Sequence, residues 1–328
     1  MQTTQTKTPV FLPRKGLRGG HRQTLASFFL PRTVALPPSE ARLIEVEKGV
    51  KVLAECHWQS DRQKPLTVII VHGLEGSSES QYMLGIAAKG LALGMNVVRM
   101  NQRNCGGTEA LAATLYHSGR SQDVAAVAQN LIDQDHISRF ALAGFSMGGN
   151  LVLKLAGEWG SAAPAQFRAV AAVCPAVDLA ASADALHRCS NRLYEEYFLW
   201  KLKGRLRTKA RLFPGAFDTS RLRGIASLRD FDDKITAFYC GFTGADDYYD
   251  RAAAAHILDR ISVPTFILHA ANDPFIRILP ETRRKFLDNP NITFLETEDG
   301  GHCSFLAETN GSDGHWAESQ VVEYLRQF

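Results

Sequence analysis

The chain alternates between two hydrophobic periods, and this alternation limits the folds that it can adopt. Short continuous runs of apolar, often β-branched residues are typical of strands buried on both faces, as in a parallel sheet. Stretches with a single apolar stripe, which indicate helices, lie between these runs. The predicted strands are residues 67–71, 96–100, 139–144, 168–174, 265–270 and 291–296, and the predicted helices include 79–93, 121–134, 147–159 and 315–327. This pattern predicts a doubly wound, mostly parallel α/β sheet with helices on both faces.

Two basic segments interrupt or precede the alternation. Residues 1–32 contain six basic residues and no acidic one. A mostly helical stretch follows the fourth strand run, and within it residues 188–223 carry ten Lys or Arg against three acids. Residues 42–57 precede the first parallel strand and indicate an antiparallel hairpin. We therefore expect an N-terminal basic arm at 1–40, a core at 41–177 and 236–328, and a helical cap insertion at 178–235.

The overall composition is that of a globular protein with a large core. The chain has 328 residues, of which 45% are hydrophobic and 22% charged, and its formal net charge is +3. These values exclude a disordered or collagen-like chain. A chain of this length buries about three quarters of its extended surface, so it can enclose a deep pocket.

The same features predict a cytoplasmic protein. No run approaches the about 20 apolar residues that a membrane-spanning helix needs, and the first 30 residues show no secretory signal pattern. The cysteines have no Cys-x-x-Cys spacing, which favours reduced thiols over disulfides or a zinc site. They are Cys56, Cys105, Cys174, Cys189, Cys240 and Cys303.

A sharp strand-to-helix turn is predicted at residues 144–149, Gly-Phe-Ser-Met-Gly-Gly. A serine hydroxyl is a weak nucleophile unless the chain projects it clear of the backbone beside a base. Such a turn does this, and glycines two residues before and two residues after the serine relieve the crowding it creates. The turn also places Ser146 at a helix N-terminus, where free N–H groups favour negative charge. Ser146 is the candidate nucleophile, and a Gly-rich connection without chemistry is the alternative.

A serine nucleophile needs a histidine base, and that histidine needs a carboxylate to fix its tautomer. His302 follows the last strand run in Asp-Gly-Gly-His, so its ring can reach the carboxyl ends of the strands, where α/β sheets place their chemistry. Asp273 follows the strand run 265–270 in Asn-Asp-Pro and is the candidate carboxylate. Asp178 is the second candidate for that role. The order Ser146, Asp273, His302 is the one that accompanies this type of turn.

The oxyanion of a tetrahedral intermediate requires two preorganised N–H donors. We expect one from Met147, directly after the nucleophile. We expect the other from Leu74, in the loop His-Gly-Leu-Glu-Gly that follows the strand run 67–71. His72 at the start of this loop is predicted to support the turn rather than to act as a second base.

On these motifs the chain resembles the α/β-hydrolase superfamily, and within it the YheT-like group, also called the AB hydrolase 4 family. The resemblance covers nearly the whole chain and rests on residues 20–24, 72–77, 101–107, 144–150, 174–179, 272–274 and 300–303. It implies a catalytic set at Ser146, Asp273 and His302 and hydrolysis of carboxylic esters. Relatives in the family include acyl-lipid and medium-chain ester hydrolases and some alcohol acyltransferases. Asn104 departs from the glycine that is usual in the family, which bears only on local loop geometry.

The predicted cap carries an aromatic cluster. Tyr197, Phe198 and Trp200 are candidate substrate-binding residues, because aromatic side chains over the site suit an acyl chain or another apolar group. At this helical spacing, packing of the cap onto the core is the alternative.

A basic run follows the aromatic cluster, and it consists of Lys201-Leu202-Lys203 and Arg205-Leu206-Arg207. It is either a solvated helix face or a surface attracted to anionic lipid or to anionic substrates such as acyl-CoA. Each basic residue near anionic lipid contributes about 1 kcal/mol. Phe28 and Phe29 in the arm would reinforce peripheral association with an anionic membrane surface.

The leading hypothesis is a serine hydrolase that cleaves carboxylic esters of short to medium acyl chains through an acyl-enzyme. Acyl transfer from an ester or acyl-CoA to an alcohol on the same triad is the alternative. A non-catalytic binding or scaffold protein on the same fold is the alternative of another class. No metal or cofactor is expected, since metalloprotease and P-loop motifs and Cys pairs are absent, and no recognition fold supports nucleic-acid binding. The expected partner is a small-molecule acyl ester; the oligomeric state stays open.

Overall fold

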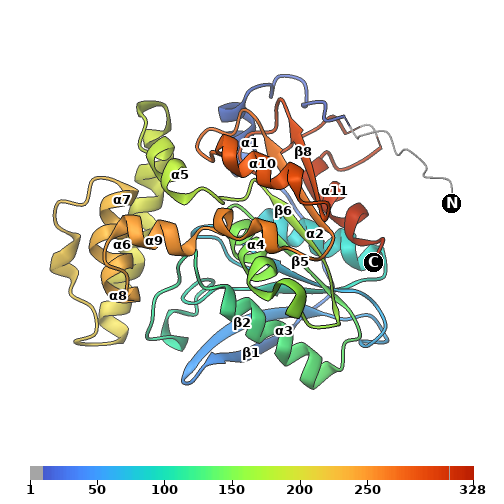
Figure 1. The fold of residues 1–328 in the computed structure, drawn as a ribbon, viewed down its shortest axis with the longest axis horizontal. Coiled ribbons are helices and arrows are strands. Elements are labelled where there is room, and N and C mark those ends of the chain that lie inside the picture. Colours follow the sequence, from blue (N-terminus) through green and yellow to red (C-terminus); the bar gives the residue numbers. More distant parts are fainter. Residues whose placement is uncertain (1–9, 310) are drawn as a thin grey trace.

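An eight-stranded sheet runs through the centre of the molecule. The computed structural model describes residues 10–309 and 311–328. The strands are Glu40–Glu47 (β1), Val50–His57 (β2), Thr67–Val71 (β3), Asn96–Met100 (β4), Phe140–Phe145 (β5), Phe167–Val173 (β6), Thr265–Ala270 (β7) and Ile292–Thr297 (β8). Their order across the sheet is β1-β2-β4-β3-β5-β6-β7-β8. The predicted α/β architecture is confirmed, and Figure 1 shows helices on both sides of the sheet.

Six of the strands are parallel, and two antiparallel strands close one edge. β1 and β2 form the expected hairpin, and β2 pairs antiparallel with β4. β3 lies between β4 and β5 and is parallel to both. Ligands of such sheets bind beyond the carboxyl ends of the strands.

Two hydrophobic layers cover the two faces of the sheet. Along β3, Val68 and Ile70 point into one layer and Ile69 and Val71 into the other, as the two-residue period of a strand requires. The first layer is completed by α2 (Gln81–Ala92) and α11 (Trp316–Leu325), and the second by α3 (Ser121–Asp135), α4 (Met147–Trp159) and α10 (Pro280–Asp288). Every residue of β3, β4, β5 and β7 is buried, so the ends of these strands are held at fixed positions.

The predicted N-terminal arm contains a helix that packs onto the core. This helix, α1 (Gly20–Phe29), buries the side chain of Gln23 fully. The Gln23 amide donates to Leu306 O at 3.0 Å, and its oxygen accepts from Leu306 N at 2.7 Å. The arm is therefore anchored beside the loop that follows β8. Lys7, one of its basic residues, lies outside the described residues.

A helical region lies between β6 and β7, at the left of Figure 1. It comprises α5 (Leu179–Leu186), α6 (Arg192–Leu212), α7 (Leu228–Phe231), a π-helix (Asp232–Ala237), α8 (Phe238–Cys240) and α9 (Ala245–Ala252). The expected cap boundary at residue 235 falls inside the π-helix, and helices continue beyond it. The division of the chain into arm, core and cap stays a prediction.

A buried ion pair attaches α6 to the core. The Arg205 guanidinium donates to both carboxylate oxygens of Glu75, each at 2.8 Å, and to Glu109 at 3.1 Å. The Glu75 side chain is 2% exposed and the Arg205 side chain 11% exposed. Desolvation opposes the charge on Arg205, but the hydrogen bond with the Glu75 carboxylate and the charge of Glu75 raise the pKa of Arg205 above its ordinary value. Arg205 therefore holds the helical region to the core.

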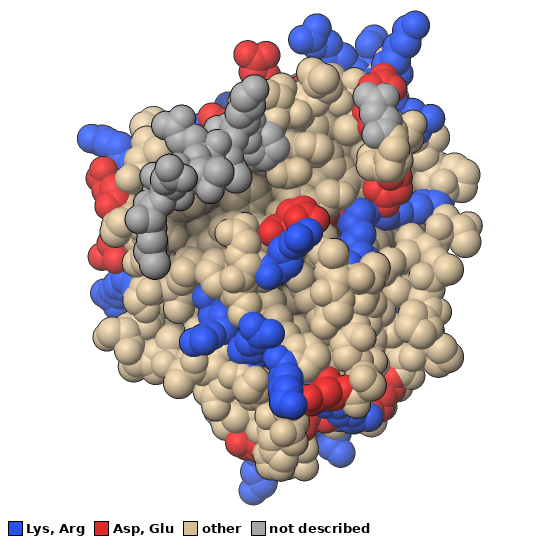
Figure 2. All heavy atoms as spheres, turned by 90° about the vertical axis from the view of Figure 1, so that its right-hand side faces the viewer, with Lys and Arg blue, Asp and Glu red and all other residues tan. Residues whose placement is uncertain are grey.

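Lys203 of the basic run and Lys209, which follows the run, are also hydrogen-bonded within the protein. Lys203 donates to Ile225 O at 2.8 Å. Lys209, one turn beyond Arg205, is buried and donates to Glu109 O at 2.9 Å, and burial lowers its pKa to about 8. The positive charge of α6 is thus only partly a solvated face. Figure 2 shows the opposite side of the molecule, where basic and acidic side chains are interspersed.

Replacing Arg205 with methionine is expected to lower the free energy of unfolding by about 3–5 kcal/mol, because it leaves the Glu75 carboxylate buried without a cation. Equilibrium unfolding in urea measures the loss. The matched control is Arg192→Met on the same helix, where the pair with Glu196 is exposed, and little change is expected. Equal losses in the two variants would contradict the structural role assigned to Arg205.

Candidate active site

Four loops that follow β3, β5, β7 and β8 meet at the carboxyl edge of the sheet. Ser146 comes directly after β5, and Leu74 lies in the loop after β3. Asp273 and His302 lie in the loops after β7 and β8. Each residue singled out in the sequence for catalysis thus follows a different strand of the parallel set.

The turn between β5 and α4 is so tight that two positions have no room for a side chain. A Cβ on Gly144 would lie 2.3 Å from Gly148 O, and a Cβ on Gly148 would lie 2.2 Å from Val71 O. Ser146 itself has φ 54° and ψ −120°, a conformation that costs a non-glycine residue about 1–3 kcal/mol. The turn therefore places Ser146 directly before α4 and projects its side chain away from the backbone.

His302 is oriented by Asp273. His302 Nδ1 lies 2.8 Å from Asp273 Oδ2. Asp273 Oδ1 accepts from the backbone amides of Phe275 at 3.0 Å and Ile276 at 2.9 Å. The Asp273 side chain is fully buried. Three donors on one carboxylate fix both its position and its charge.

The two side chains shift each other's pKa in opposite directions. Burial raises the pKa of Asp273, but the charge and the hydrogen bond of His302 outweigh it and the pKa lies below its ordinary value. Burial lowers the pKa of His302, but the Asp273 charge and hydrogen bond outweigh it and the pKa lies above its ordinary value. Asp273 is therefore ionised and favours the imidazolium form of His302.

The Cys303 side chain contacts both His302 and Ser146. The Cys303 thiol is 3.8 Å from His302 Nε2, donates to Val173 O at 3.5 Å and contacts the Ser146 backbone. Within the described residues no hydrogen bond joins the Ser146 hydroxyl to His302. Catalytic hydrogen bonds of this kind are often long without substrate and tighten when it binds. The sequence analysis assigned no role to Cys303.

Two backbone amides beside Ser146 have no acceptor among the described residues. They belong to Leu74 and Met147, whereas the neighbouring Gly73 and Glu75 amides donate to the hydroxyls of Tyr82 and Tyr116. A Cβ on Gly73 would lie 3.1 Å from Ser146 Cβ, so this glycine lets the Leu74 loop approach the serine. The two amides expected to be donors are thus left available.

His72 supports the same loop, as the sequence analysis predicted. Its side chain is fully buried, Nδ1 donates to Gly73 O at 2.8 Å, and Nε2 accepts from Gln102 N at 3.1 Å. Burial lowers the pKa of His72 to about 4. It is therefore neutral and committed to the backbone, with no part in proton transfer at Ser146.

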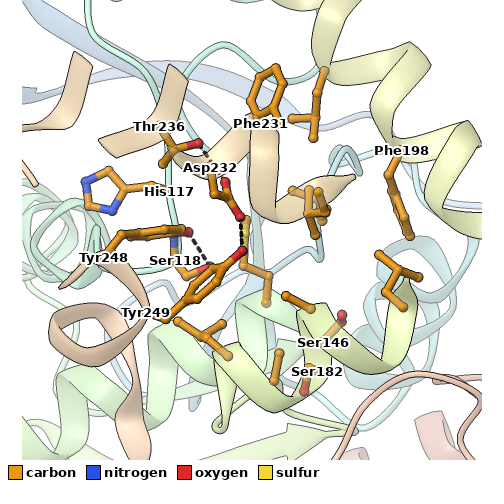
Figure 3. A pocket seen from close by; sticks show the side chains of 18 of the residues that line it. His117, Ser118, Ser146, Ser182, Phe198, Phe231, Asp232, Thr236, Tyr248 and Tyr249 are labelled. Atoms are coloured by element: carbon orange, nitrogen blue, oxygen red, sulfur yellow. Dashed lines mark hydrogen bonds between the residues drawn. The ribbon is translucent and has the colours of Figure 1, made fainter. Parts of the chain in front are cut away.

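A mostly apolar pocket opens beside Ser146. Figure 3 shows Ser146 on one side of it and Phe198, from α6, on its wall. Tyr197 and Trp200, also proposed from the sequence, do not line this pocket and are 38% and 69% exposed. Leu199, Leu202 and Leu206 take the buried side of α6.

Two further sequence questions are resolved by hydrogen bonds. Asp178, the second candidate for the carboxylate, accepts from Leu279 N at 2.9 Å and from the Thr282 hydroxyl at 2.8 Å, so it caps α10 and does not contact His302. Asn104 has φ 64° and its amide donates to Ala112 O at 3.2 Å. Asparagine tolerates this left-handed conformation, which explains why it can stand where the family usually has glycine.

The arm positions the His302 loop, which the sequence analysis did not predict. The His302 amide donates to the Thr24 hydroxyl at 2.9 Å, and the Gly19 amide donates to Asp299 at 2.8 Å. A Cβ on Gly20 would lie 1.9 Å from Asn272 O, so α1 begins in direct contact with the turn that carries Asp273. The sequence signal was the motif at residues 20–24, which is part of the resemblance to the family but was assigned no role.

Two groups of side chains have the spacing of metal ligands, and both include Cys174. Cys174, His302 and Cys303 form one group, and Cys174, His269 and Asp273 form the other, with ligand atoms within 4.8 Å of one another. His302 and Asp273 bond to each other, so these groups overlap the candidate catalytic pair. The expectation that no metal is needed stays a prediction. All six cysteines are free thiols.

Comparisons with known proteins show the family to which this chain belongs. A family model described as the alpha/beta hydrolase fold matches residues 67–309. The chain is 30% identical over 322 residues to "Putative esterase YheT" of Escherichia coli (strain K12), which covers 97% of this chain and 93% of that protein. It is 30% identical over 244 residues to phospholipase ABHD3 of Mus musculus, which covers 73% of this chain and 58% of that protein.

A solved structure gives the same result for the fold. Esterase Pf2001 of Pyrococcus furiosus matches with a TM-score of 0.58 and 18% identity, over 91% of this chain and 98% of that one. No helix among the described residues is long and apolar enough to span a membrane. The family match, the full-length relative and the sheet together assign this chain to the α/β-hydrolase family, in its YheT-like group.

Proposed function

We propose that this protein is a serine hydrolase that cleaves carboxylic esters through an acyl-enzyme. The observation that carries the proposal is the 2.8 Å contact between His302 Nδ1 and the buried Asp273 carboxylate, beside a serine held at a strained turn. The likeness to an esterase-named relative over 97% of the chain supports the same reaction class. The apolar pocket beside Ser146 supports a substrate with an apolar chain.

In the proposed mechanism, Ser146 Oγ attacks the ester carbonyl while His302 Nε2 accepts the hydroxyl proton. The tetrahedral intermediate collapses as His302 returns this proton to the leaving alcohol, and the acyl group stays on Ser146. Water then attacks the acyl-enzyme by the same proton transfers and releases the acid. Asp273 holds His302 in the tautomer that leaves Nε2 free to accept and stabilises the imidazolium.

The oxyanion would be held by the Leu74 and Met147 amides. Both have no other acceptor among the described residues, and Met147 begins α4, so the positive end of the helix dipole adds to the stabilisation. Removing one such donor costs roughly 3–4 kcal/mol of barrier in enzymes of this kind.

Ser146→Ala is expected to abolish labelling by a fluorophosphonate probe and hydrolysis of p-nitrophenyl esters, because it removes the attacking oxygen. His302→Ala should lower kcat by about 10³-fold or more. Ser161→Ala is the matched control, since Ser161 is exposed on a surface turn, and it should label like the wild type. A folded wild type that does not label would favour the non-catalytic scaffold. Adding a short alcohol to the assay separates hydrolysis from acyl transfer by the product formed.

The acid limb of the kcat/KM profile is expected to follow His302. The neutral imidazole is the base, so activity is present above the His302 pKa and is lost as pH falls through it. Since Asp273 raises this pKa, Asp273→Asn should move the acid limb to lower pH while lowering kcat by up to about 10⁴-fold.

Asp178→Asn is the control for this profile. Asp178 lies in the core at the start of α5 and is hydrogen-bonded to α10. Its substitution should leave the acid limb in place. An identical shift in both variants would show that the profile does not report on the pair of His302 and Asp273.

We also propose peripheral association with an anionic membrane surface, through what we call the aromatic patch: Phe28, Phe29, Leu193, Tyr197 and Trp200. These side chains lie on α1 and α6 and are 38–77% exposed. The Phe28 and Tyr197 rings are 5.4 Å apart, so the two helices share the patch. Monomeric proteins rarely expose contiguous apolar areas without use. The cytoplasmic location predicted from the sequence remains part of this proposal.

Phe29→Ser with Trp200→Ser is expected to reduce cosedimentation with anionic phospholipid vesicles at least tenfold, since both side chains would insert at the interface. Leu287→Ser is the matched control, because Leu287 is 72% exposed on α10, away from the patch. The charge contribution is tested with Lys201→Ala and Arg207→Ala, since Arg205 and Lys203 are bonded within the protein. Binding unchanged by all four substitutions would exclude the proposal.

A further inference from the structure

The pocket beside Ser146 has two chemically different ends. The serine end leads between apolar walls that include Leu179, Leu186, Phe198 and Leu202. Figure 3 shows polar side chains gathered on the side away from Ser146, from the π-helix, from α9 and from the loop before α3. They are Ser118, Asp232, Thr236, Tyr248 and Tyr249. An acyl or alkyl chain alone would not need such a polar end.

Asp232 is the charged group of this polar end and has no cation bound to it. Its Oδ1 accepts from the Thr236 hydroxyl at 2.7 Å, and its Oδ2 accepts from the Tyr249 hydroxyl at 2.8 Å. No ion pair involves Asp232 within the described residues. Arg229, whose charge lowers the pKa of Asp232, is engaged by Asp184 at 2.9 Å and by Asp246. Burial raises the pKa of Asp232 to about 6, so the group is largely ionised at neutral pH.

Three hydroxyl donors at the polar end are already used within the protein. The hydroxyls of Thr236 and Tyr249 both donate to Asp232, and the Tyr248 hydroxyl donates to Ser118 Oγ at 2.9 Å. Two carboxylate oxygens can accept about four hydrogen bonds, and Asp232 receives two from the protein. A buried ionised carboxylate is costly unless it is paired or fully hydrogen-bonded. A ligand that brings donors or positive charge would supply what the protein does not.

The backbone at this position is also unusual. Asp232 begins the π-helix Asp232–Ala237, and π-turns are rare and frequent at functional sites. The wider turn places Asp232 and Thr236 on the same side, four residues apart and bonded to each other. Phe231 and Tyr249 also line the pocket, and the Arg229 guanidinium lies over the Tyr249 ring at 5.1 Å.

We propose that the Asp232 end of the pocket binds a terminal ammonium or hydroxyl group on the chain of the substrate whose ester lies at Ser146. The inference rests on the proposed hydrolase function and names a substrate class for it: esters with an aliphatic chain that ends in a hydrogen-bond donor. Asp232 accepts a hydrogen bond from the terminal group, the apolar walls contact the aliphatic chain between the two ends, and Ser146 reacts with the ester.

The test compares three series of p-nitrophenyl esters of graded chain length, ending in methyl, hydroxyl or ammonium groups. A second set, of acetate esters of alcohols with the same three ends, covers the case in which the pocket holds the alcohol side. At a matching length, kcat/KM of the donor-ended ester should exceed that of the methyl-ended ester by about tenfold or more. A preference for the ammonium-ended ester would identify an ammonium group as the ligand of this end, and a preference for the hydroxyl-ended ester would identify a hydroxyl group. Either result supports the proposal.

Asp232→Asn should remove the ammonium preference, so that the ratio of kcat/KM between the ammonium-ended and the methyl-ended ester of matching length falls close to one. The change is nearly isosteric, and the amide can still bond to both Thr236 and Tyr249. Asp233→Asn is the matched control, since the neighbouring Asp233 is exposed and bonds only to the Ala245 amide among the described residues. This control should keep the preference.

The outcomes separate the two proposals. A wild type that hydrolyses methyl-ended esters but shows no end-group preference at any length, in either set, overturns the inference while the hydrolase function stands. A wild type that hydrolyses no ester overturns the proposed function itself. If Asp232→Asn fails to fold, the test uses the wild type and measures how strongly alkylammonium ions, alkanols and alkanes of equal length inhibit its hydrolysis of p-nitrophenyl acetate. Stronger inhibition by alkylammonium ions or alkanols than by alkanes supports the proposal. Equal inhibition by all three classes contradicts the proposal.

Discussion

Close backbone contact around Ser146 is the constraint on which the rest of the site depends. Gly144, Gly148 and Gly73 bring three chain segments together where a Cβ would lie 2.2–3.1 Å from its nearest neighbour. For Gly144 and Gly148 that neighbour is a backbone carbonyl, which cannot turn aside as a side chain can. The sheet holds these segments by its own hydrogen bonds, so the strained φ of Ser146 is maintained by parts of the fold that have no chemical role.

The histidine side of the site depends on a different part of the chain. The His302 loop bonds to Thr24 and, through Leu306, to Gln23, residues about 280 positions away in sequence. Loops carry functional groups when a rigid scaffold positions them, and here α1 is part of that scaffold. The serine is thus fixed by local crowding and the histidine by long-range polar contacts. The two halves of the site have independent structural causes.

This difference explains what the sequence could predict. Ser146, Asp273 and His302 each follow a strand run with turn residues beside them, so local pattern was sufficient to nominate them, and the alternation of strands and helices predicted the sheet. The role of Arg205 was not predictable, because its partner Glu75 is 130 residues away and α6 reads locally as a basic helix. Helical spacing also shows which residues of α6 share a face, but it does not show which face packs on the core. Leu199, Leu202 and Leu206 turn inward, so Phe198 reaches the pocket while Trp200 faces solvent.

The ion pair between Arg205 and Glu75 connects α6, which lines the pocket, to the loop that carries Leu74. Glu75 directly follows Leu74, whose amide is a candidate oxyanion donor, and the Glu75 amide itself donates to Tyr116. Tyr116 in turn donates to the Glu75 carboxylate at 2.6 Å and lies under the Arg205 guanidinium. Arg205 of α6 and Tyr116 therefore together hold the carboxylate of the residue that follows Leu74. Since Leu202 and Leu206 of the same helix line the pocket, α6 contacts both the substrate pocket and the loop that carries the candidate oxyanion donor.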